Sequence, residues 1–142
     1  MILNNAIHPI LIVEDNPLDL DLTIRAFKSQ NIDNPLLTAR DGEEALAYIG
    51  KWDKGEQKPV VILLDLKMPK IGGLEVLDVL KKHPEYCTIP VVVLTTSSES
   101  VDVKSAYQKG ANSYIVKPVD FGKFISIAKE IDLYWRVINK TI

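Results

Sequence analysis

Four short, uninterrupted apolar runs, dominated by branched aliphatic residues, constrain the fold of this chain more than any other feature. They occupy residues 10–13, 60–64, 91–94 and 114–116, and residues 36–39 form a weaker fifth run. Continuous rather than alternating apolarity is typical of parallel strands that are covered on both faces. The runs therefore predict the buried strands of an α/β domain.

Segments with helical periodicity lie between these runs. The first begins at Asn16 and Pro17, where a capping residue precedes a proline at the first helical position. Two more start after Asp41-Gly42 and after Gly72-Gly73, a fourth runs from residues 97–100 to Gly110, and a fifth runs from about Phe121 to Ile138. Five strands that alternate with five helices predict a doubly wound α/β domain, with a parallel sheet and right-handed crossovers.

Size and composition fit one domain with an ordinary core. The chain has 142 residues, of which 46% are hydrophobic and 25% are charged, and its single Cys87 cannot form an intramolecular disulfide. We expect a single domain over residues 1–142, with a core of about 9–130 and a last helix that extends to about 138. No repeat or linker indicates a second, output domain.

Charge and hydropathy exclude several classes of function. The formal net charge is -2 and the lysines are scattered, so the chain lacks the basic footprint of a nucleic-acid-binding protein. The apolar runs are far shorter than the roughly 20 residues that cross a bilayer. The N-terminus lacks the basic start and apolar stretch of a secretory signal. We therefore expect a cytoplasmic protein that binds neither nucleic acid nor membranes.

Polar and ionisable residues follow each of the four strong runs. Glu14 and Asp15 follow the first run, Asp65 the second, Thr95 the third and Lys117 the fourth. In doubly wound folds, ligands bind at the carboxyl ends of the parallel strands. A strand order of 2-1-3-4-5 would make the first and third strands neighbours. We therefore expect Glu14, Asp15 and Asp65 to lie in one crevice.

Three clustered carboxylates predict a bound divalent cation. They would repel one another unless they share a cation, and an oxygen-only cluster suits Mg²⁺, which retains coordination positions for phosphoryl oxygens. Lys117 would add a fixed positive charge and Thr95 a hydrogen-bond donor. We interpret Asp65 as the nucleophile of a phosphoryl transfer, with Glu14 and Asp15 holding the metal. The acyl phosphate that forms would be a temporary mark.

These residues belong to four segments that together resemble a known family. The segments are Ile-Val-Glu-Asp-Asn at 12–16, Leu-Leu-Asp-Leu-Lys-Met-Pro at 63–69 with Gly72-Gly73, Val-Leu-Thr-Thr at 93–96, and Lys117-Pro118. They resemble the signature of response-regulator receiver domains, the phosphoacceptors of two-component signalling. The resemblance implies a flavodoxin-like receiver fold of strand order 2-1-3-4-5. It also implies that a histidine kinase or a phosphotransfer protein phosphorylates the chain on Asp65.

The same resemblance implies roles for individual residues. Thr95 would be the switch hydroxyl, Tyr114 the switch aromatic and Lys117 the phosphate-binding lysine, joined to Pro118 by a cis peptide bond. The backbone carbonyl of Lys67 would be a further Mg²⁺ ligand. Such a domain is not an enzyme towards other substrates, because it catalyses only its own phosphoryl transfer and slow dephosphorylation. It signals by phosphorylation-dependent association with other proteins.

Two positions leave the lifetime of the phosphorylated state open. Lys67 lies two residues past Asp65, and Ser97 lies two residues past Thr95. In the family, side chains at these positions border the phosphoryl site and alter water access.

The end of the chain indicates a narrower resemblance and an interface. Its length and the ending Leu133-Tyr134-Trp135 are similar to stand-alone regulators that partner bacterial phytochromes, which implies a phytochrome-type kinase. The apolar side chains of the predicted last helix cover about half its circumference, more than the ~100° stripe that a core requires. We therefore expect a homodimer whose interface includes Tyr134 and Trp135.

Other functions fit parts of the pattern. A phosphatase with an aspartyl-phosphate intermediate would use the same nucleophile and metal. It would carry a second aspartate two residues later as general acid, where this chain has Lys67. A flavin-binding electron carrier shares the topology, but Glu14 and Asp15 would repel its phosphate. Tyr114 fits simple packing on a strand as well as a switching role.

Overall fold

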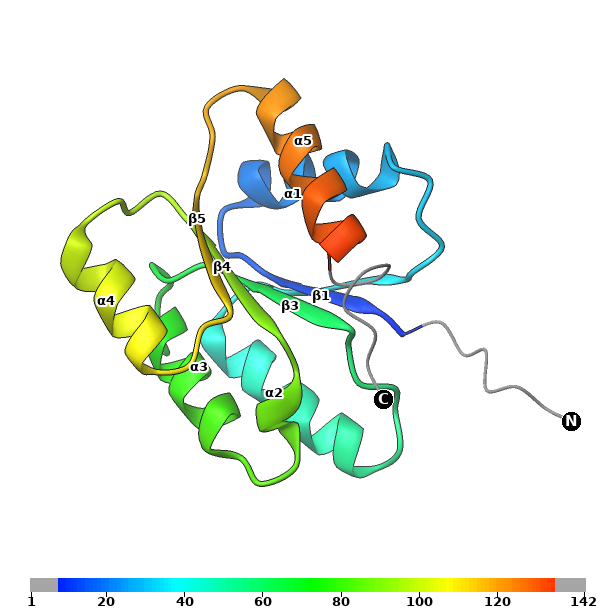
Figure 1. Ribbon diagram of the computed structural model, residues 1–142. Helices are drawn as coiled ribbons and strands as arrows, with labels where there is room; N and C mark the ends of the chain where they lie inside the picture. The colour runs from blue at the N-terminus through cyan, green and yellow to red at the C-terminus, as the bar shows by residue number, and fades with distance from the viewer. Residues whose placement is uncertain (1–7, 135–142) are drawn as a thin grey trace, which may run out of the picture.

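A five-stranded parallel sheet lies between two layers of helices (Figure 1). The computed structural model describes residues 8–134. The strands are β1 (Ile10–Val13), β2 (Leu36–Ala39), β3 (Val61–Leu64), β4 (Val91–Thr95) and β5 (Ser113–Val116). They are arranged in the order β2-β1-β3-β4-β5, and every neighbouring pair is parallel. The predicted fold class and strand order are confirmed.

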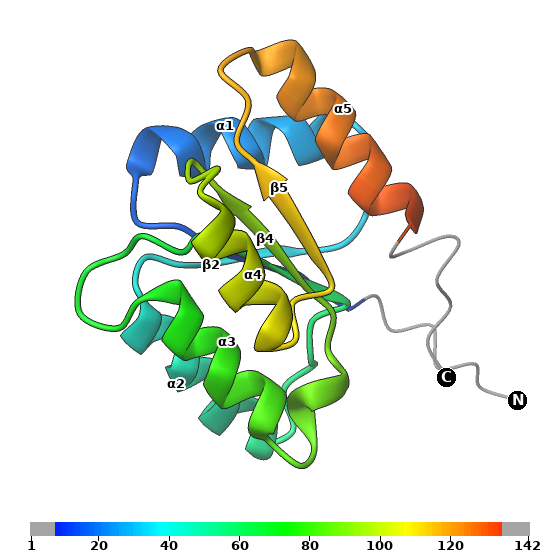
Figure 2. The ribbon, with the colours of Figure 1, turned by 60° about the vertical axis from the view of Figure 1, so that its left-hand side comes forward.

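Helices connect the strands and cover both faces of the sheet. They are α1 (Pro17–Lys28), α2 (Gly42–Asp53), α3 (Gly73–Lys82), α4 (Ser100–Gln108) and α5 (Phe121–Ile131), with a short 3₁₀ turn, η1 (Tyr86–Thr88), before β4. Helices α1 and α5 pack side by side on one face, and α2, α3 and α4 cover the other (Figures 1 and 2). None of the helices within residues 8–134 is long and apolar enough to cross a membrane.

The last helix differs from its predicted extent. The α-helix ends at Ile131, and residues 132–134 form a π-helical turn. The rest of the predicted helix, residues 135–138, lies outside the described residues. That part includes Trp135, one of the two predicted interface residues.

The central strands β1, β3 and β4 are buried on both faces, as their continuous apolarity predicts. The edge strands β2 and β5 are only partly buried, because each has a neighbour on one side alone, so the prediction of a fully buried strand at residues 114–116 is wrong. Side chains of β1 alternate between the two cores: Leu11 and Val13 pack towards α2, α3 and α4, whereas Ile10 and Ile12 pack towards α1 and α5. All four are at most 2% exposed. The backbone of β1 is therefore fixed at the centre of the molecule, and so is the position of the residues that follow it.

Side-chain caps fix where the helices around the strand ends begin. The side-chain oxygen of Asn16 accepts hydrogen bonds from the backbone N–H groups of Leu18 and Asp19, at 2.9 and 3.1 Å, directly before α1. Asp41 caps α2 and Asp120 caps α5 in the same way. These loops leave the carboxyl edge of the sheet, so the caps also fix where the helices begin around that edge.

Close packing at the carboxyl edge of the sheet requires a glycine at position 73. Gly73 begins α3 directly against β3, and a Cβ atom at this position would clash with the backbone of Asp65 and Leu66. The N–H of Gly73 donates a 3.0 Å hydrogen bond to the carbonyl of Leu66. The loop between β3 and α3 is thus drawn back tightly over the residue that follows β3.

Candidate phosphoacceptor site

The structure brings the three predicted carboxylates together at the carboxyl edge of the sheet. One oxygen from each of Glu14, Asp15 and Asp65 lies within 4.8 Å of the others. Glu14 is 4% exposed and Asp65 is 5% exposed, while Asp15 is half-buried. The N–H of Asp65 donates to the carbonyl of Val13 at 3.0 Å, which continues the pairing of β1 with β3 past the strand ends. The sheet itself therefore positions the cluster.

Lys117 extends from the end of β5 into this cluster. Its Nζ lies 2.5 Å from Oε1 of Glu14 and 3.6 Å from Oδ2 of Asp65. It also lies 2.9 Å from Oδ2 of Asp19, in the first turn of α1. The lysine side chain is only 5% exposed. A single buried ammonium thus connects the ends of β1 and β3 with the start of α1.

Asp19 is a site residue that the sequence analysis did not identify. An acidic residue in the first turn of a helix is common because it interacts favourably with the helix dipole. That local explanation hides its second role as a partner of Lys117, which is 98 residues away in the sequence. The pairing becomes visible only when α1 is known to pack beside α5.

Burial and charge act in opposite directions on the ionisation of the site. Burial raises the pKa of Glu14 to about 7; the hydrogen bond from Lys117 opposes this rise, and the charge of Asp65 adds to it. Burial alone would lower the pKa of Lys117, but its hydrogen bonds to Glu14 and Asp19 outweigh burial and raise the pKa. One ammonium faces the carboxyl groups of Glu14, Asp19 and Asp65, and Asp15 adds a further carboxyl group to the cluster, so carboxyl groups outnumber ammonium groups and a divalent cation would offset their charge.

Thr95 contributes a buried hydroxyl at the end of β4. Its side-chain oxygen is the one buried side-chain polar atom without a hydrogen-bond partner in residues 8–134, and the residue is 0% exposed. The sheet register pairs Leu64 with Val93, so Asp65 and Thr95 leave the same edge of adjacent strands. Leaving such a group unpaired costs about 1–3 kcal/mol. A ligand oxygen at this edge would satisfy it.

Tyr114 contacts the loop after β4, and Lys67 contacts α4, the helix that follows this loop. The hydroxyl of Tyr114 donates to the carbonyl of Ser97 at 2.8 Å. The ammonium of Lys67 lies 3.3 Å from Oδ2 of Asp102, on α4. The switching role of Tyr114 and the metal-binding role of the Lys67 carbonyl stay predictions.

The expected cis peptide bond between Lys117 and Pro118 is wrong. The bond is trans, and no cis bond occurs anywhere between residues 8 and 134. Trans is favoured by about 0.5–1 kcal/mol at a bond preceding proline, so cis requires a compensating interaction. No such compensation is needed here, because Lys117 reaches Glu14, Asp19 and Asp65 with the trans bond.

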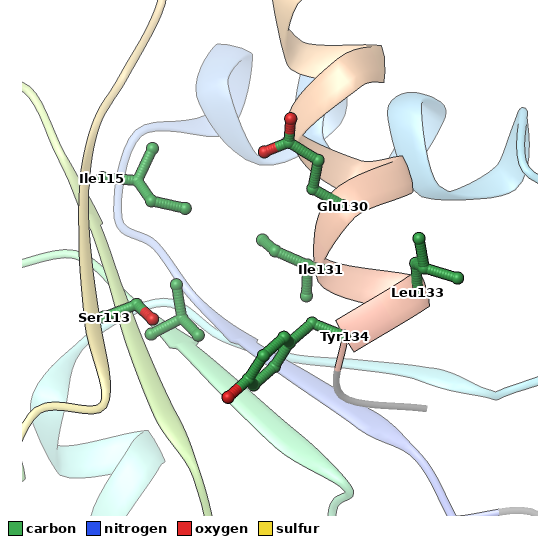
Figure 3. A pocket seen from close by; sticks show the side chains of 7 residues that line it. Ser113, Ile115, Glu130, Ile131, Leu133 and Tyr134 are labelled. Carbon is green, nitrogen blue, oxygen red and sulfur yellow. The ribbon is translucent and has the colours of Figure 1, made fainter. Parts of the chain in front are cut away.

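An apolar hollow of about 350 Å³ lies away from this cluster, between β5 and the end of α5 (Figure 3). Ile115 on β5 faces Ile131 on α5, and Tyr134 closes one end. Tyr134 is 52% exposed. Ser113, at the start of β5, also lines the hollow, so the hollow opens near the strand end opposite to Lys117. The hollow is therefore separate from the site of the carboxylates.

Comparison with known proteins identifies the family. Residues 10–129 match the response regulator receiver domain. The chain belongs to this family. As a receiver, it is a signalling domain of the two-component type rather than a conventional enzyme.

Several relatives of this receiver are similar over nearly its whole length. The probable methanogenesis regulatory protein FilR2 of Methanothrix harundinacea is 39% identical over 133 residues, covering 93% of this chain and 86% of the relative. Response regulator Rcp1 of Synechocystis is 38% identical over 128 residues, covering 89% of this chain and 87% of Rcp1.

Solved structures agree with these relatives. The phosphorylated cyanobacterial phytochrome response regulator RcpA matches with a TM-score of 0.88 and 36% identity, covering 95% of this chain and 98% of RcpA. The Mn²⁺-bound form of Rcp1 matches with a TM-score of 0.84 and 33% identity, covering 95% of this chain and 99% of Rcp1. This chain therefore shares its family and its fold with RcpA and Rcp1.

The unpaired hydroxyl of Thr95 leads to a stability prediction. Thr95→Val removes a buried group without a partner and keeps the shape of the side chain, so we expect the free energy of unfolding to rise by about 1 kcal/mol. Thr23→Val is the matched control. Thr23 is 2% exposed, and its hydroxyl donates to the carbonyl of Asp19 at 2.8 Å. We expect that variant to lose about 1 kcal/mol. Urea unfolding of the metal-free protein measures both, and equal losses would contradict the assignment.

Proposed function

We propose that this receiver accepts a phosphoryl group on Asp65 from a histidine kinase or a phosphotransfer protein, with Mg²⁺, and then signals through association. The observation that carries the proposal is the convergence of three carboxylates, the Lys117 ammonium and the unpaired Thr95 hydroxyl at one edge of the sheet. Each group matches one requirement of transfer to an aspartate: a nucleophile, a cation site and donors for the phosphoryl oxygens.

The donor set of the cluster fits a hard divalent cation. Oxygens of Glu14, Asp15 and Asp65, with the backbone carbonyl of Lys67, would hold Mg²⁺, which prefers oxygen ligands and keeps several waters. The bound ion would neutralise charge on the carboxylates and on the incoming phosphoryl group. The Mn²⁺-bound form of Rcp1 supports a divalent cation in a relative of similar fold.

The chain's own groups divide the work of the transfer. An oxygen of Asp65 attacks the phosphorus atom as the bond from phosphorus to the donor's histidine nitrogen breaks, and that nitrogen leaves with its electron pair. The Lys117 ammonium moves from its carboxylate partners towards the new phosphoryl oxygens, which carry about -1.5 to -2 charge. Thr95 donates its hydroxyl hydrogen to another of these oxygens. Asp65 thus forms an acyl phosphate, whose slow hydrolysis by the same site resets the receiver.

The switch follows from the movement of Thr95. A Thr95 hydroxyl drawn towards the phosphoryl group would carry the loop after β4 with it. The hydroxyl of Tyr114 donates a hydrogen bond to the carbonyl of Ser97 in this loop, so the position of Tyr114 depends on where the loop lies. We infer a two-state equilibrium that phosphorylation shifts and that alters the surface around α4 and β5.

The surface formed by α4, β5 and α5 is the one that we propose for self-association (Figure 2). Its exposed apolar side chains are Val101 and Tyr107 on α4, Val116 on β5 and Phe121 on α5, with Leu133 and Tyr134 in the turn that follows α5. Exposed apolar groups gathered on one face are typical of an interface. The predicted contribution of Trp135 lies outside the described residues.

The similarity to Rcp1 and RcpA supports a kinase of the phytochrome type as the phosphoryl donor.

A cytoplasmic location and a single domain spanning residues 1–142 stay predictions.

Asp65→Asn tests the phosphoacceptor directly. The amide is not a nucleophile, so we expect base-labile labelling by acetyl phosphate to fall below a hundredth of the wild-type level. Asp21→Asn is the control, because Asp21 is an exposed acid on α1 that pairs with Arg25 at 2.9 Å. Undiminished labelling of Asp65→Asn would disprove the proposal.

Asp15→Asn tests the cation site. Asp15 is half-buried and belongs to the carboxylate cluster, so losing its charge should weaken Mg²⁺ binding by about tenfold or more. Removal of Mg²⁺ with EDTA should stop labelling of Asp65 in the wild type. Mg²⁺ titration by calorimetry measures the first effect. Full labelling in metal-free buffer would contradict the role of the cation.

Tyr134→Asp tests self-association. We expect the wild type to dimerise at micromolar concentration in sedimentation velocity, and a charge at this half-exposed aromatic to shift the protein to monomer. Leu18→Asp is the control, because Leu18 is 66% exposed on α1, outside the proposed surface. A wild type that stays monomeric with and without acetyl phosphate would rule the dimer out.

A further inference from the structure

Asp102 is a buried acid that lies outside the carboxylate cluster. It belongs to the first turn of α4 and is 9% exposed. Its Oδ2 accepts a 2.5 Å hydrogen bond from the hydroxyl of Ser97 and lies 3.3 Å from Nζ of Lys67. The hydrogen bond from Ser97 outweighs burial and, with help from Lys67, lowers the pKa of Asp102. The residue is therefore ionised at neutral pH, and both interactions end on the same oxygen.

The two partners of Asp102 come from the loops on either side of the phosphoacceptor. Lys67 is the second residue after Asp65, and Ser97 is the second residue after Thr95. Strands β3 and β4 are neighbours, so these loops leave the sheet side by side. The carbonyl of Ser97 also accepts the hydrogen bond from Tyr114. One carboxylate thus links both loops of the site to α4 and, through Ser97, to β5.

Lys67 can reach more than one anion. Two residues span at most roughly 7 Å of extended chain, so the backbone of Lys67 stays near that of Asp65. The Lys67 side chain is 63% exposed, and its flexible stem is free to turn. A phosphoryl group on Asp65 would present about two negative charges, against the single charge of Asp102. The ammonium would therefore exchange Asp102 for the phosphoryl oxygens.

We propose that Asp102 is a positioning residue for phosphoryl transfer: it holds the Lys67 ammonium on α4 before transfer and releases it to the phosphoryl group on Asp65. This inference rests on the proposed function. Asp102 touches neither the phosphoryl group nor the cation, and it acts only through Lys67. Because holding Lys67 away from Asp65 removes a positive charge from the path of an anionic donor, Asp102 slows phosphorylation of the resting receiver.

Asp102→Asn is the informative substitution. The amide keeps an oxygen that can accept the hydrogen bond from Ser97, but it lacks the charge that holds Lys67. The initial rate of Asp65 labelling by subsaturating acetyl phosphate with Mg²⁺ is expected to rise roughly two- to fivefold, the scale set by an exposed ion pair. Asp102→Glu, which keeps the charge, should return the rate towards that of the wild type.

Testing Asp102→Asn in a variant that lacks the Lys67 ammonium separates the positioning role of Asp102 from a general effect of its charge. In Lys67→Met, which keeps the backbone carbonyl, Asp102→Asn should no longer change the rate, because the two substitutions act on one interaction. Asp78→Asn is the remote control: this acid on α3 pairs with Lys82 at 3.0 Å and Lys109 at 3.6 Å, and the variant should label at the wild-type rate.

The outcomes distinguish a failure of the positioning role of Asp102 from a failure of the proposed function. An unchanged rate in folded Asp102→Asn, verified by circular dichroism, overturns the positioning role. An equal increase with and without Lys67 also overturns it, because the charge of Asp102 would then act without the lysine. A folded wild type that acetyl phosphate does not label on Asp65 overturns the proposed function itself.

Discussion

The buried ammonium of Lys117 is the interaction on which the site depends. It draws together Glu14 after β1, Asp65 after β3 and Asp19 on α1, while its own backbone N–H donates to the carbonyl of Thr95 at 2.7 Å. Without this ammonium, buried carboxylates would face one another with no neutralising charge, and their protonated forms would be lower in free energy than their ionised forms. With it, the cluster stays close enough to share a cation. The lysine thus makes the cation site possible, although it is not a ligand itself.

This arrangement is precise because the least deformable part of the molecule carries it. β1, β3 and β4 are buried on both faces, and their register is continued by the hydrogen bond from Asp65 to Val13. A shift of one residue in the pairing register would move every side chain of a strand to the opposite face of the sheet. The functional groups lie at the ends of these strands or within two residues of them: Thr95 is the last residue of β4, and Glu14 and Asp65 directly follow β1 and β3. Gly73 closes α3 over Asp65 so tightly that no side chain fits between them.

The sequence alone predicted the strands and the polar residues that follow them, because these features have one-dimensional signals, whereas the strand order was implied by the resemblance to receiver domains. Continuous apolar runs predict buried strands, and a polar residue directly after each run predicts the edge where Glu14, Asp65, Thr95 and Lys117 meet. Asp19 and Asp102 were not found, since an acid in the first turn of a helix has a sufficient local explanation. Their partners depend on how helices dock, which no local pattern encodes. The cis bond before Pro118 was implied by the resemblance alone, and it was wrong.

The resting site is incomplete in two ways, and a cation and a phosphoryl group together would complete it. Negative charge exceeds positive charge around Lys117, and the hydroxyl of Thr95 lacks a partner although it is fully buried. A cation alone would offset the charge but leave Thr95 unpaired, and a phosphoryl group alone would satisfy Thr95 but worsen the charge. Only the two together do both, so each should favour the binding or formation of the other. In the switch that we propose, the free energy for a change at α4 and β5 would come from these unsatisfied groups, and it would reach Tyr114 through the loop after β4.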